Sequence, residues 1–159
     1  MPSTVSVLAK LRVNYPQFSF KLGDYFLWSS SDNTIYYDDN AKNRSIFLLH
    51  ELSHALLGHI NYARDIELIA MERQAWDNAI KLAPEYDLII PDQIVETTLD
   101  SYRDWIHARS KCPRCEATGV QTEKYVYICP SCSHRWQVNE ARTCSLRRYE
   151  IKIKQKTHD

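Results

Sequence analysis

Four stretches of the chain place apolar residues three and four positions apart, which is the spacing of a helix with one buried face. They are, in chain order, residues 3–13, Ser45–Gly58, Asp65–Leu82 and a stretch that begins at Asp92. The second is the most apolar, and Ser45 is placed to cap its start and Gly58 to end it. We expect it to be a buried helix whose apolar residues all avoid solvent: Ile46, Phe47, Leu49, Leu52, Leu56 and Leu57.

Shorter stretches alternate apolar or aromatic residues with polar ones, which predicts strands. Ahead of the most apolar helix they lie at residues 18–22, 25–28 and 34–37. We expect these to form two or three antiparallel strands. Similar stretches predict strands further along, at residues 125–128, 134–138 and 149–154, with a short buried one at 88–90. The pattern indicates an α+β fold, in which a small antiparallel sheet packs on helices and a β-rich part follows.

The charges are balanced over the chain but unevenly distributed, with 20 basic and 20 acidic residues in all. Residues 1–109 hold 10 basic and 15 acidic side chains, whereas residues 110–156 hold 10 basic and 4 acidic ones. This asymmetry predicts two domains, 1–109 and 110–159, the second of which can meet an acidic partner. Because the sequence has neither a run of about 18 apolar residues nor a signal-peptide pattern, we expect a cytoplasmic protein without membrane contact.

The most apolar helix contains the residues that predict chemistry. His50 and His54 are about one helical turn apart, so both imidazoles can reach one ion, with Glu51 close to it. This HExxH spacing is the motif of zinc metallopeptidases. A catalytic zinc takes three protein ligands and one water, whose pKa it lowers to about 7. Glu51 would be the general base that takes the proton of this water.

The third ligand is expected on the next helix. Glu72 is the best candidate, because a carboxylate among large apolar neighbours needs a partner if it is buried. Three alternatives stay open. His59 lies five residues after His54, Glu67 is more simply an acid that favours a helix N-terminus, and Asp65 is more simply a helix cap.

The run HELSHALLGH, followed by the segments Asp65–Leu68 and Met71–Trp76, resembles compact gluzincins of the minigluzincin and ImmA/IrrE-type metallopeptidases. The resemblance covers roughly residues 15–83. It implies a small sheet before the HExxH helix, His50 and His54 as zinc ligands, Glu51 as base and Glu72 as third ligand. Larger gluzincins have an aspartate four residues after that glutamate to orient a ligand histidine. This chain has Trp76 there, which leaves Asp77 or a backbone carbonyl for that role.

Five cysteines follow in the C-terminal part. Two CxxC pairs, with 13 residues between them, can place four thiolates around one ion. This spacing predicts a zinc ribbon whose structural zinc is held by Cys112, Cys115, Cys129 and Cys132. Four thiolates leave no open position, so this second zinc would stabilise the fold without catalysing a reaction. Cys144 is unpaired, and we consider a role as an inhibitory thiolate beside a small apolar role.

The pattern favours a zinc-dependent metalloendopeptidase that acts on a protein or peptide substrate. The stretch Ile35–Asp38 is the candidate for an edge strand that binds the substrate as an added strand, and the alternative is a sheet that only covers the core. A donor must stabilise the developing oxyanion, and three residues are near enough in sequence: His59, Tyr62 and Arg73.

Two alternatives concern the ribbon. The SprT-like peptidases also join HExxH to a C-terminal ribbon and cleave DNA-bound proteins, although their third ligand is a histidine. The other alternative is an idle peptidase fold that recruits nucleic acid or protein through the ribbon. Recruitment is suggested by the positive charge of the ribbon and by three aromatic residues that we expect to be exposed: Tyr125, Tyr127 and Trp136. A ribbon that is only a structural cap on the peptidase is an equal alternative. The oligomeric state is left open by the sequence.

Overall fold

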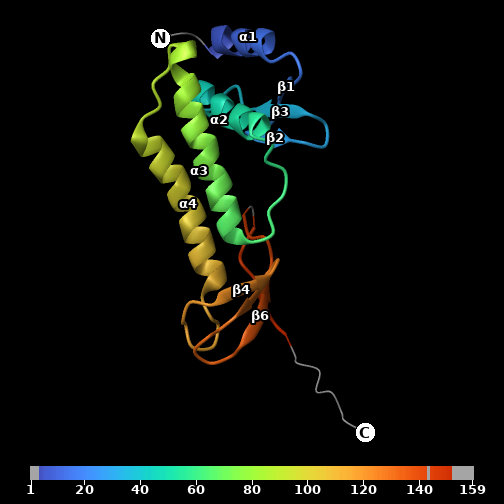
Figure 1. Ribbon diagram of the computed structural model, residues 1–159, viewed down its shortest axis with the longest axis vertical. Coiled ribbons are helices and arrows are strands. Elements are labelled where there is room, and N and C mark those ends of the chain that lie inside the picture. Colours follow the sequence, from blue (N-terminus) through green and yellow to red (C-terminus); the bar gives the residue numbers. More distant parts are fainter. Residues whose placement is uncertain (1–3, 143, 152–159) are drawn as a thin grey trace. The chain divides into compact units, whose positions relative to one another are not determined.

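The computed structural model describes residues 4–142 and 144–151, and Figure 1 shows their helices and strands. The described chain forms two compact units. The first contains the residues up to Asn61 together with Ala70–Leu99, and the second contains Tyr62–Ile69 and the residues from Asp100 onward. Helices α3 (Asp65–Leu82) and α4 (Asp92–Ser110) each contribute residues to both units. The predicted α+β class is confirmed, while a domain boundary between residues 109 and 110 stays a prediction.

A three-stranded sheet lies in the first unit. It consists of β1 (Ser19–Leu22), β2 (Leu27–Ser29) and β3 (Thr34–Tyr37), in the order β1-β3-β2. The predicted antiparallel pairing holds for β2 and β3, whereas β1 runs parallel to β3. Because β3 has a neighbour on each side, the prediction that Ile35–Asp38 is an edge strand is wrong. The edge beside the HExxH helix is β2, whose Trp28 N–H reaches Glu51 on that helix.

The HExxH helix, α2 (Arg44–Leu56), begins one residue before Ser45, which we predicted as its N-terminal cap. Ser45 lies inside the helix and is buried, and the residue before the helix is Asn43 in the left-handed conformation with φ 59°. Asparagine adopts this conformation more readily than most residues, and its carbonyl accepts the N–H of Ile46. At the other end, Gly58 takes φ 67°, as expected for a glycine that ends a helix.

The core of the first unit surrounds α2. Leu48, Leu49 and Leu52 are fully buried, and each such leucine contributes about 1.5–3 kcal/mol to stability by leaving water. The prediction that Leu56 and Leu57 are also buried is wrong, because the last turn of α2 leaves them 38% and 45% exposed. Buried residues from the neighbouring elements complete this core, among them Val7, Leu8 and Leu11 of α1 (Thr4–Asn14), Phe20, Ile35, Trp76, Ala79, Tyr86, Val95 and Leu99.

The three long helices agree closely with the hydrophobic pattern. Helix α3 has the predicted bounds, and α4 begins at Asp92 as expected. The connector between them forms a 3-10 helix, Ala83–Tyr86, and residues 88–91 that follow are irregular, so the predicted buried strand at 88–90 is wrong. Pro84 and Pro91 lie on either side of this stretch, and Ile89 within it is 88% exposed and therefore not part of a buried strand.

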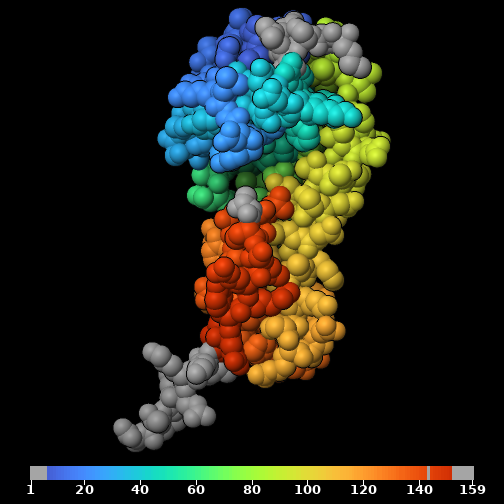
Figure 2. All heavy atoms as spheres, turned by 180° about the vertical axis from the view of Figure 1, so that it is seen from behind, coloured from blue at the N-terminus to red at the C-terminus, as the bar shows by residue number. Residues whose placement is uncertain are grey.

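The second unit contains a four-stranded antiparallel sheet. Its strands are β4 (Val120–Glu123), β5 (Val126–Ile128), β6 (Arg135–Val138) and β7 (Arg148–Glu150), paired in chain order. The residues of β7 are exposed, and the red segment that contains this strand lies at the surface in Figure 2. The predicted strand 149–154 is observed only as far as Glu150, since Ile151 is irregular, and residues 152–154 lie outside the described residues.

Candidate metal centres

Three buried side chains of the first unit converge on one point. His50 and His54 come from successive turns of α2, and Glu72 comes from the middle of α3. Their exposed fractions are 4%, 8% and 5%. The Nε2 atom of His50 lies 3.0 Å from Glu72 Oε2 and 3.1 Å from His54 Nε2, and the His54 Nε2 atom lies 3.3 Å from Glu72 Oε1. The residues expected as ligands are therefore brought together.

The spacing of these atoms fits a metal ion. Three atoms bound to one tetrahedral zinc at about 2.0–2.1 Å lie about 3.3 Å from one another. The three observed separations are 3.0–3.3 Å, so a small movement would place an ion among them. Two imidazoles and one carboxylate are also the donor set of many catalytic zinc sites. The group is therefore a candidate zinc site with three protein ligands.

The electrostatics of the group favour a cation between its members. Burial lowers the pKa of His54, but the hydrogen bond and charge of Glu72 raise it above its usual value. Burial raises the pKa of Glu72, but hydrogen bonds with His50 and His54 hold it well below its usual value. Glu72 therefore stays ionised in the protein interior. A buried carboxylate of this kind needs a positive partner, which protonated imidazole or a metal ion can supply.

Glu51 lies next to this group and is held by the sheet. Its Oε2 atom accepts the backbone N–H of Trp28 at 2.8 Å. Trp28 is the middle residue of β2, and because β2 is an outer strand, this N–H points away from β3 and toward α2. The side chain of Glu51 is half-buried. Its charge also contributes to raising the pKa of His54, so the carboxylate lies close enough to the group to act on it electrostatically.

His50 and His54 differ in what surrounds the part of each ring that faces away from Glu72. The ring of Trp76 stacks on His50, with ring centroids 4.1 Å apart. Among the described residues, Nδ1 of His50 and Nε1 of Trp76 have no hydrogen-bond partner. Asp77, which we considered as an orienting residue, instead pairs with Arg73 on the surface of α3. The Nδ1 atom of His54 lies 2.9 Å from Nδ1 of His59.

The alternatives for the third ligand have other partners. Glu67 accepts the backbone N–H groups of Ala63 and Arg64 at the start of α3. Asp65 is buried in the second unit, where its carboxylate pairs with Arg109. Asp65 therefore does more than cap the start of α3, which is the role we predicted for it. His59 contacts His54 through the ring side that faces away from Glu72, so it is not one of the three converging residues.

The structure also shows the contacts of the three residues that we considered as stabilisers of the oxyanion. Arg73 is exposed and pairs with Asp77 and Glu96, and His59 contacts His54 and Gln74. Tyr62 belongs to the second unit, where the ammonium of Lys124 lies over its ring. Which group stabilises an oxyanion therefore stays a prediction.

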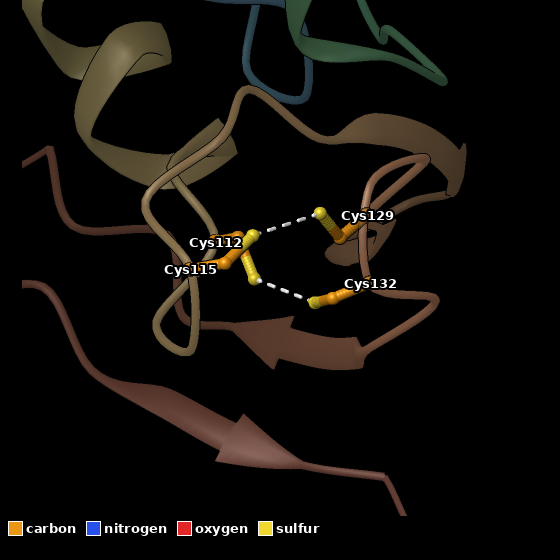
Figure 3. Close-up of side chains that lie close together, drawn as sticks. All are labelled: Cys112, Cys115, Cys129 and Cys132. Carbon is orange, nitrogen blue, oxygen red and sulfur yellow. Dashed lines mark hydrogen bonds between the residues drawn. The ribbon is translucent and has the colours of Figure 1, made fainter.

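Four cysteine sulfurs converge in the second unit (Figure 3). The sulfurs of Cys112 and Cys132 are 3.7 Å apart, and those of Cys115 and Cys129 are 3.5 Å apart. Four sulfurs bound to one tetrahedral zinc at about 2.3 Å lie about 3.8 Å from one another, so these separations fit a four-sulfur zinc site. The four predicted cysteines are thus brought together, at the two turns that Figure 3 shows facing each other.

Backbone N–H groups lower the pKa of two of these thiols, which favours the thiolate form that binds a cation. The N–H groups of Cys132 and Ser131 lower the pKa of Cys129 to about 7. Burial raises the pKa of Cys112, but the N–H groups of Cys115 and Arg114 bring it below its usual value. The N–H of His134 lowers the pKa of Cys132, while burial and the other thiols raise it to about 11. Four thiolates repel one another, so full ionisation requires a metal ion.

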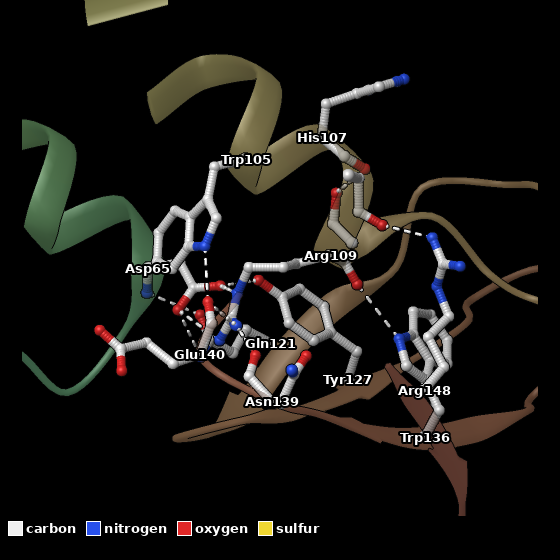
Figure 4. A network of polar contacts seen from close by, with 12 residues as sticks. Asp65, Trp105, His107, Arg109, Gln121, Tyr127, Trp136, Asn139, Glu140 and Arg148 are labelled. Carbon is white, nitrogen blue, oxygen red and sulfur yellow. Dashed lines mark hydrogen bonds and ion pairs between the residues drawn. The ribbon is translucent and has the colours of Figure 1, made fainter. Parts of the chain in front are cut away.

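A buried ion pair next to the ribbon sheet was missed by sequence reasoning (Figure 4). Arg109 and Asp65 are 1% and 2% exposed, and Arg109 Nε donates to Asp65 Oδ2 at 2.6 Å. Tyr127 donates its hydroxyl to the same oxygen at 2.5 Å, and Gln121 Nε2 donates to Asp65 Oδ1 at 3.3 Å. Arg109 also donates to the backbone oxygens of Asn139 and Glu140. Because these residues are far apart in sequence, no local pattern indicates the network.

Two of the aromatic residues that we expected on the surface are buried. Tyr127 is 3% exposed and Trp136 is fully buried, whereas Tyr125 is half-buried. The prediction of an exposed aromatic surface made of these residues is therefore wrong. Tyr127 and Trp136 stack on each other and form a small buried core in the second unit together with Cys112, Cys129 and Val138. An exposed tyrosine occurs instead at Tyr149 on β7.

Two remaining predictions concern the tail and the membrane. Cys144 is exposed, with its sulfur 3.5 Å from the side-chain nitrogen of Asn139, and its inhibitory role stays a prediction. Among the helices of the described residues, none has the length and apolar character needed to cross a membrane. A cytoplasmic location stays a prediction.

Comparison with protein-family models, with curated proteins and with solved structures gave no match for this chain.

Proposed function

We propose that this protein is a zinc-dependent metalloendopeptidase with one catalytic and one structural zinc. The observation that carries the proposal is the convergence of His50, His54 and Glu72, buried and 3.0–3.3 Å apart, beside Glu51. Two imidazoles and one carboxylate would hold the catalytic zinc, whose fourth position then takes water. A zinc ion held there lowers the pKa of its water to about 7 and polarises the scissile carbonyl.

Individual residues of the site have separate roles in the proposed reaction. Glu51 takes one proton from the attacking water and passes it to the nitrogen of the leaving amine, so that the hydroxyl joins the carbonyl carbon as the peptide bond breaks. The N–H of Trp28 holds one oxygen of Glu51 and keeps the carboxylate on the metal side of α2. The buried ring of Trp76 fixes His50 by stacking. Because the outward N–H of Trp28 in β2 already donates to Glu51, the strand edge that binds an extended substrate stays a prediction.

A glutamate as third ligand supports a gluzincin rather than a SprT-like peptidase. The resemblance to SprT-like peptidases would require a third histidine, and the buried group near His50 and His54 is Glu72. In the described residues, the metal-binding groups are this one and the four-cysteine group. We infer that the ribbon zinc, held by four thiolates, has a structural role.

The test is the replacement Glu51→Gln, which removes the base and keeps the shape of the side chain. Glu67→Gln is the matched control, because Glu67 is an exposed glutamate outside the candidate site. The zinc-loaded full chain is incubated with a proteome-derived peptide library, and new termini are read by mass spectrometry. We expect cleavage by the parent chain and by Glu67→Gln, and a loss of about 10²–10⁴-fold in Glu51→Gln at unchanged zinc content. Equal cleavage by Glu51→Gln, or none by the zinc-loaded parent, would refute the proposal.

A second function, recruitment of nucleic acid by the ribbon, is favoured by one observation. A depression of about 290 Å³ in the second unit is lined by Arg114, Arg148 and the exposed Tyr149, with Pro113, His134, Glu150 and the buried Trp136 around them. Salt-dependent binding of single-stranded DNA that weakens in Arg148→Ala would support this role. If the Glu51→Gln chain kept its full biological effect together with such binding, the peptidase fold would be an idle recruiting module.

A further inference from the structure

A short chain of hydrogen bonds leads outward from His54. Its Nδ1 atom lies 2.9 Å from Nδ1 of His59, and Nε2 of His59 lies 3.0 Å from Oε1 of Gln74. Gln74 is on α3, two residues after Glu72. The three side chains therefore connect α2, the turn after it and α3, and they meet the candidate zinc site at one of its ligands.

The proton positions along this chain follow from the chemistry of its ends. An imidazole that holds a metal through Nε2 carries its proton on Nδ1, so His54 must donate from Nδ1. His59 Nδ1 is then the acceptor, which places the proton of His59 on Nε2. That N–H donates to Oε1 of Gln74, an amide oxygen that can only accept. The tautomer of His59 that accepts from His54 is thus also the one that donates to Gln74.

The backbone holds His59 in this position from two sides. Its N–H donates to the carbonyl of His54 at 3.0 Å, and its carbonyl accepts the indole N–H of Trp28 at 3.1 Å. Gly58, with φ 67°, makes the turn that brings the chain back beside the end of α2. A turn held in this way places the imidazole of His59 with little loss of conformational freedom when a metal binds. His50 differs, because among the described residues its Nδ1 has no partner.

We propose that His59 is a positioning residue for the ligand His54, whose Nδ1–H it accepts. The inference rests on the proposed zinc site, because it assigns a role toward that zinc. Hydrogen bonds to the outer nitrogen of a ligand histidine orient the ring and increase its basicity, and their loss costs about 10–100-fold in metal affinity. His59 therefore contributes to holding the metal without contacting it.

The experiment measures cobalt binding to the full-length chain by competition with a chelator. The two sites are read separately, because cobalt bound to four sulfurs has an intense sulfur-to-metal absorption band that a histidine and carboxylate site lacks. The variants are His59→Ala, which removes the acceptor, and His59→Asn, whose Oδ1 can take the place of Nδ1. His107→Ala is the control, since His107 is an exposed histidine of the second unit. The four-sulfur site reports within the same sample whether a variant is folded there.

We expect His59→Ala to weaken cobalt binding at the histidine site by about 10–100-fold and to leave the four-sulfur site unchanged. His59→Asn should stay within about threefold of the parent chain, because the acceptor is restored. Unchanged affinity in His59→Ala, or an equal loss in His59→Asn, would overturn the inference alone. A parent chain that binds cobalt only through sulfur would overturn the proposed function and this inference together.

Discussion

The buried pair of Arg109 and Asp65 permits a quantitative prediction. The replacement Arg109→Met keeps much of the side-chain volume but leaves the carboxylate of Asp65 without its cation. Both side chains are almost completely withdrawn from water, at 1% and 2% exposure. Removing one partner of such a pair costs about 3–5 kcal/mol, because the other charge stays buried and uncompensated. Tyr127 and Gln121 still donate to Asp65, so we expect the lower end, about 3 kcal/mol.

The assay is urea unfolding of the zinc-saturated chain, followed by tryptophan fluorescence. Trp105 is a local probe, because the guanidinium of Arg109 lies 4.4 Å from the centre of its ring. The matched control is Arg73→Met, which removes exposed pairs with Asp77 and Glu96 and should cost about 0.2–1 kcal/mol for each pair. A double variant, Arg109→Met with Asp65→Leu, should be more stable than Arg109→Met alone. If Arg109→Met lost no more stability than the control, the reasoning would be refuted.

Three further predictions concern the second unit. Burial and the hydrogen bond to Asp65 raise the pKa of Tyr127, so the folded state keeps the phenol neutral and stability should fall as the pH rises above about 10. Because Tyr15 and Tyr62 are shifted in the same direction, urea midpoints should show a smaller loss in Tyr127→Phe than in the parent chain. Removal of zinc by a chelator should unfold the ribbon, because structural zinc supplies about 10–16 kcal/mol in such modules, and fluorescence of buried Trp136 should report it. Cys144→Ser should raise peptidase activity if this thiol inhibits the catalytic zinc, and equal activity would retire that role.

The helices could be predicted because their pattern is local. Helix α3 has the predicted bounds, since Asp65 begins a run whose apolar residues repeat every three to four positions up to Leu82. The three buried metal-site residues were found for the same reason. His50 and His54 share one helix face, and Glu72 is a lone carboxylate among apolar neighbours.

The features that were missed depend on contacts between distant residues. The direction of β1 could not be predicted, because alternation is the same in parallel and antiparallel strands. The cap was assigned to Ser45 by residue type, whereas the turn geometry at Asn43 begins the helix. The partners of Arg109 and His59 lie elsewhere in the chain, so only the folded structure brings them together.

The metal content of the purified full chain tests the central claim most directly. We predict two zinc ions per chain, one of which is lost in Glu72→Ala while the four cysteines retain the other. Cys112→Ser should give the reverse, with the histidine site still loaded. A parent chain that holds a single zinc, unchanged in Glu72→Ala and lost in Cys112→Ser, would contradict the account.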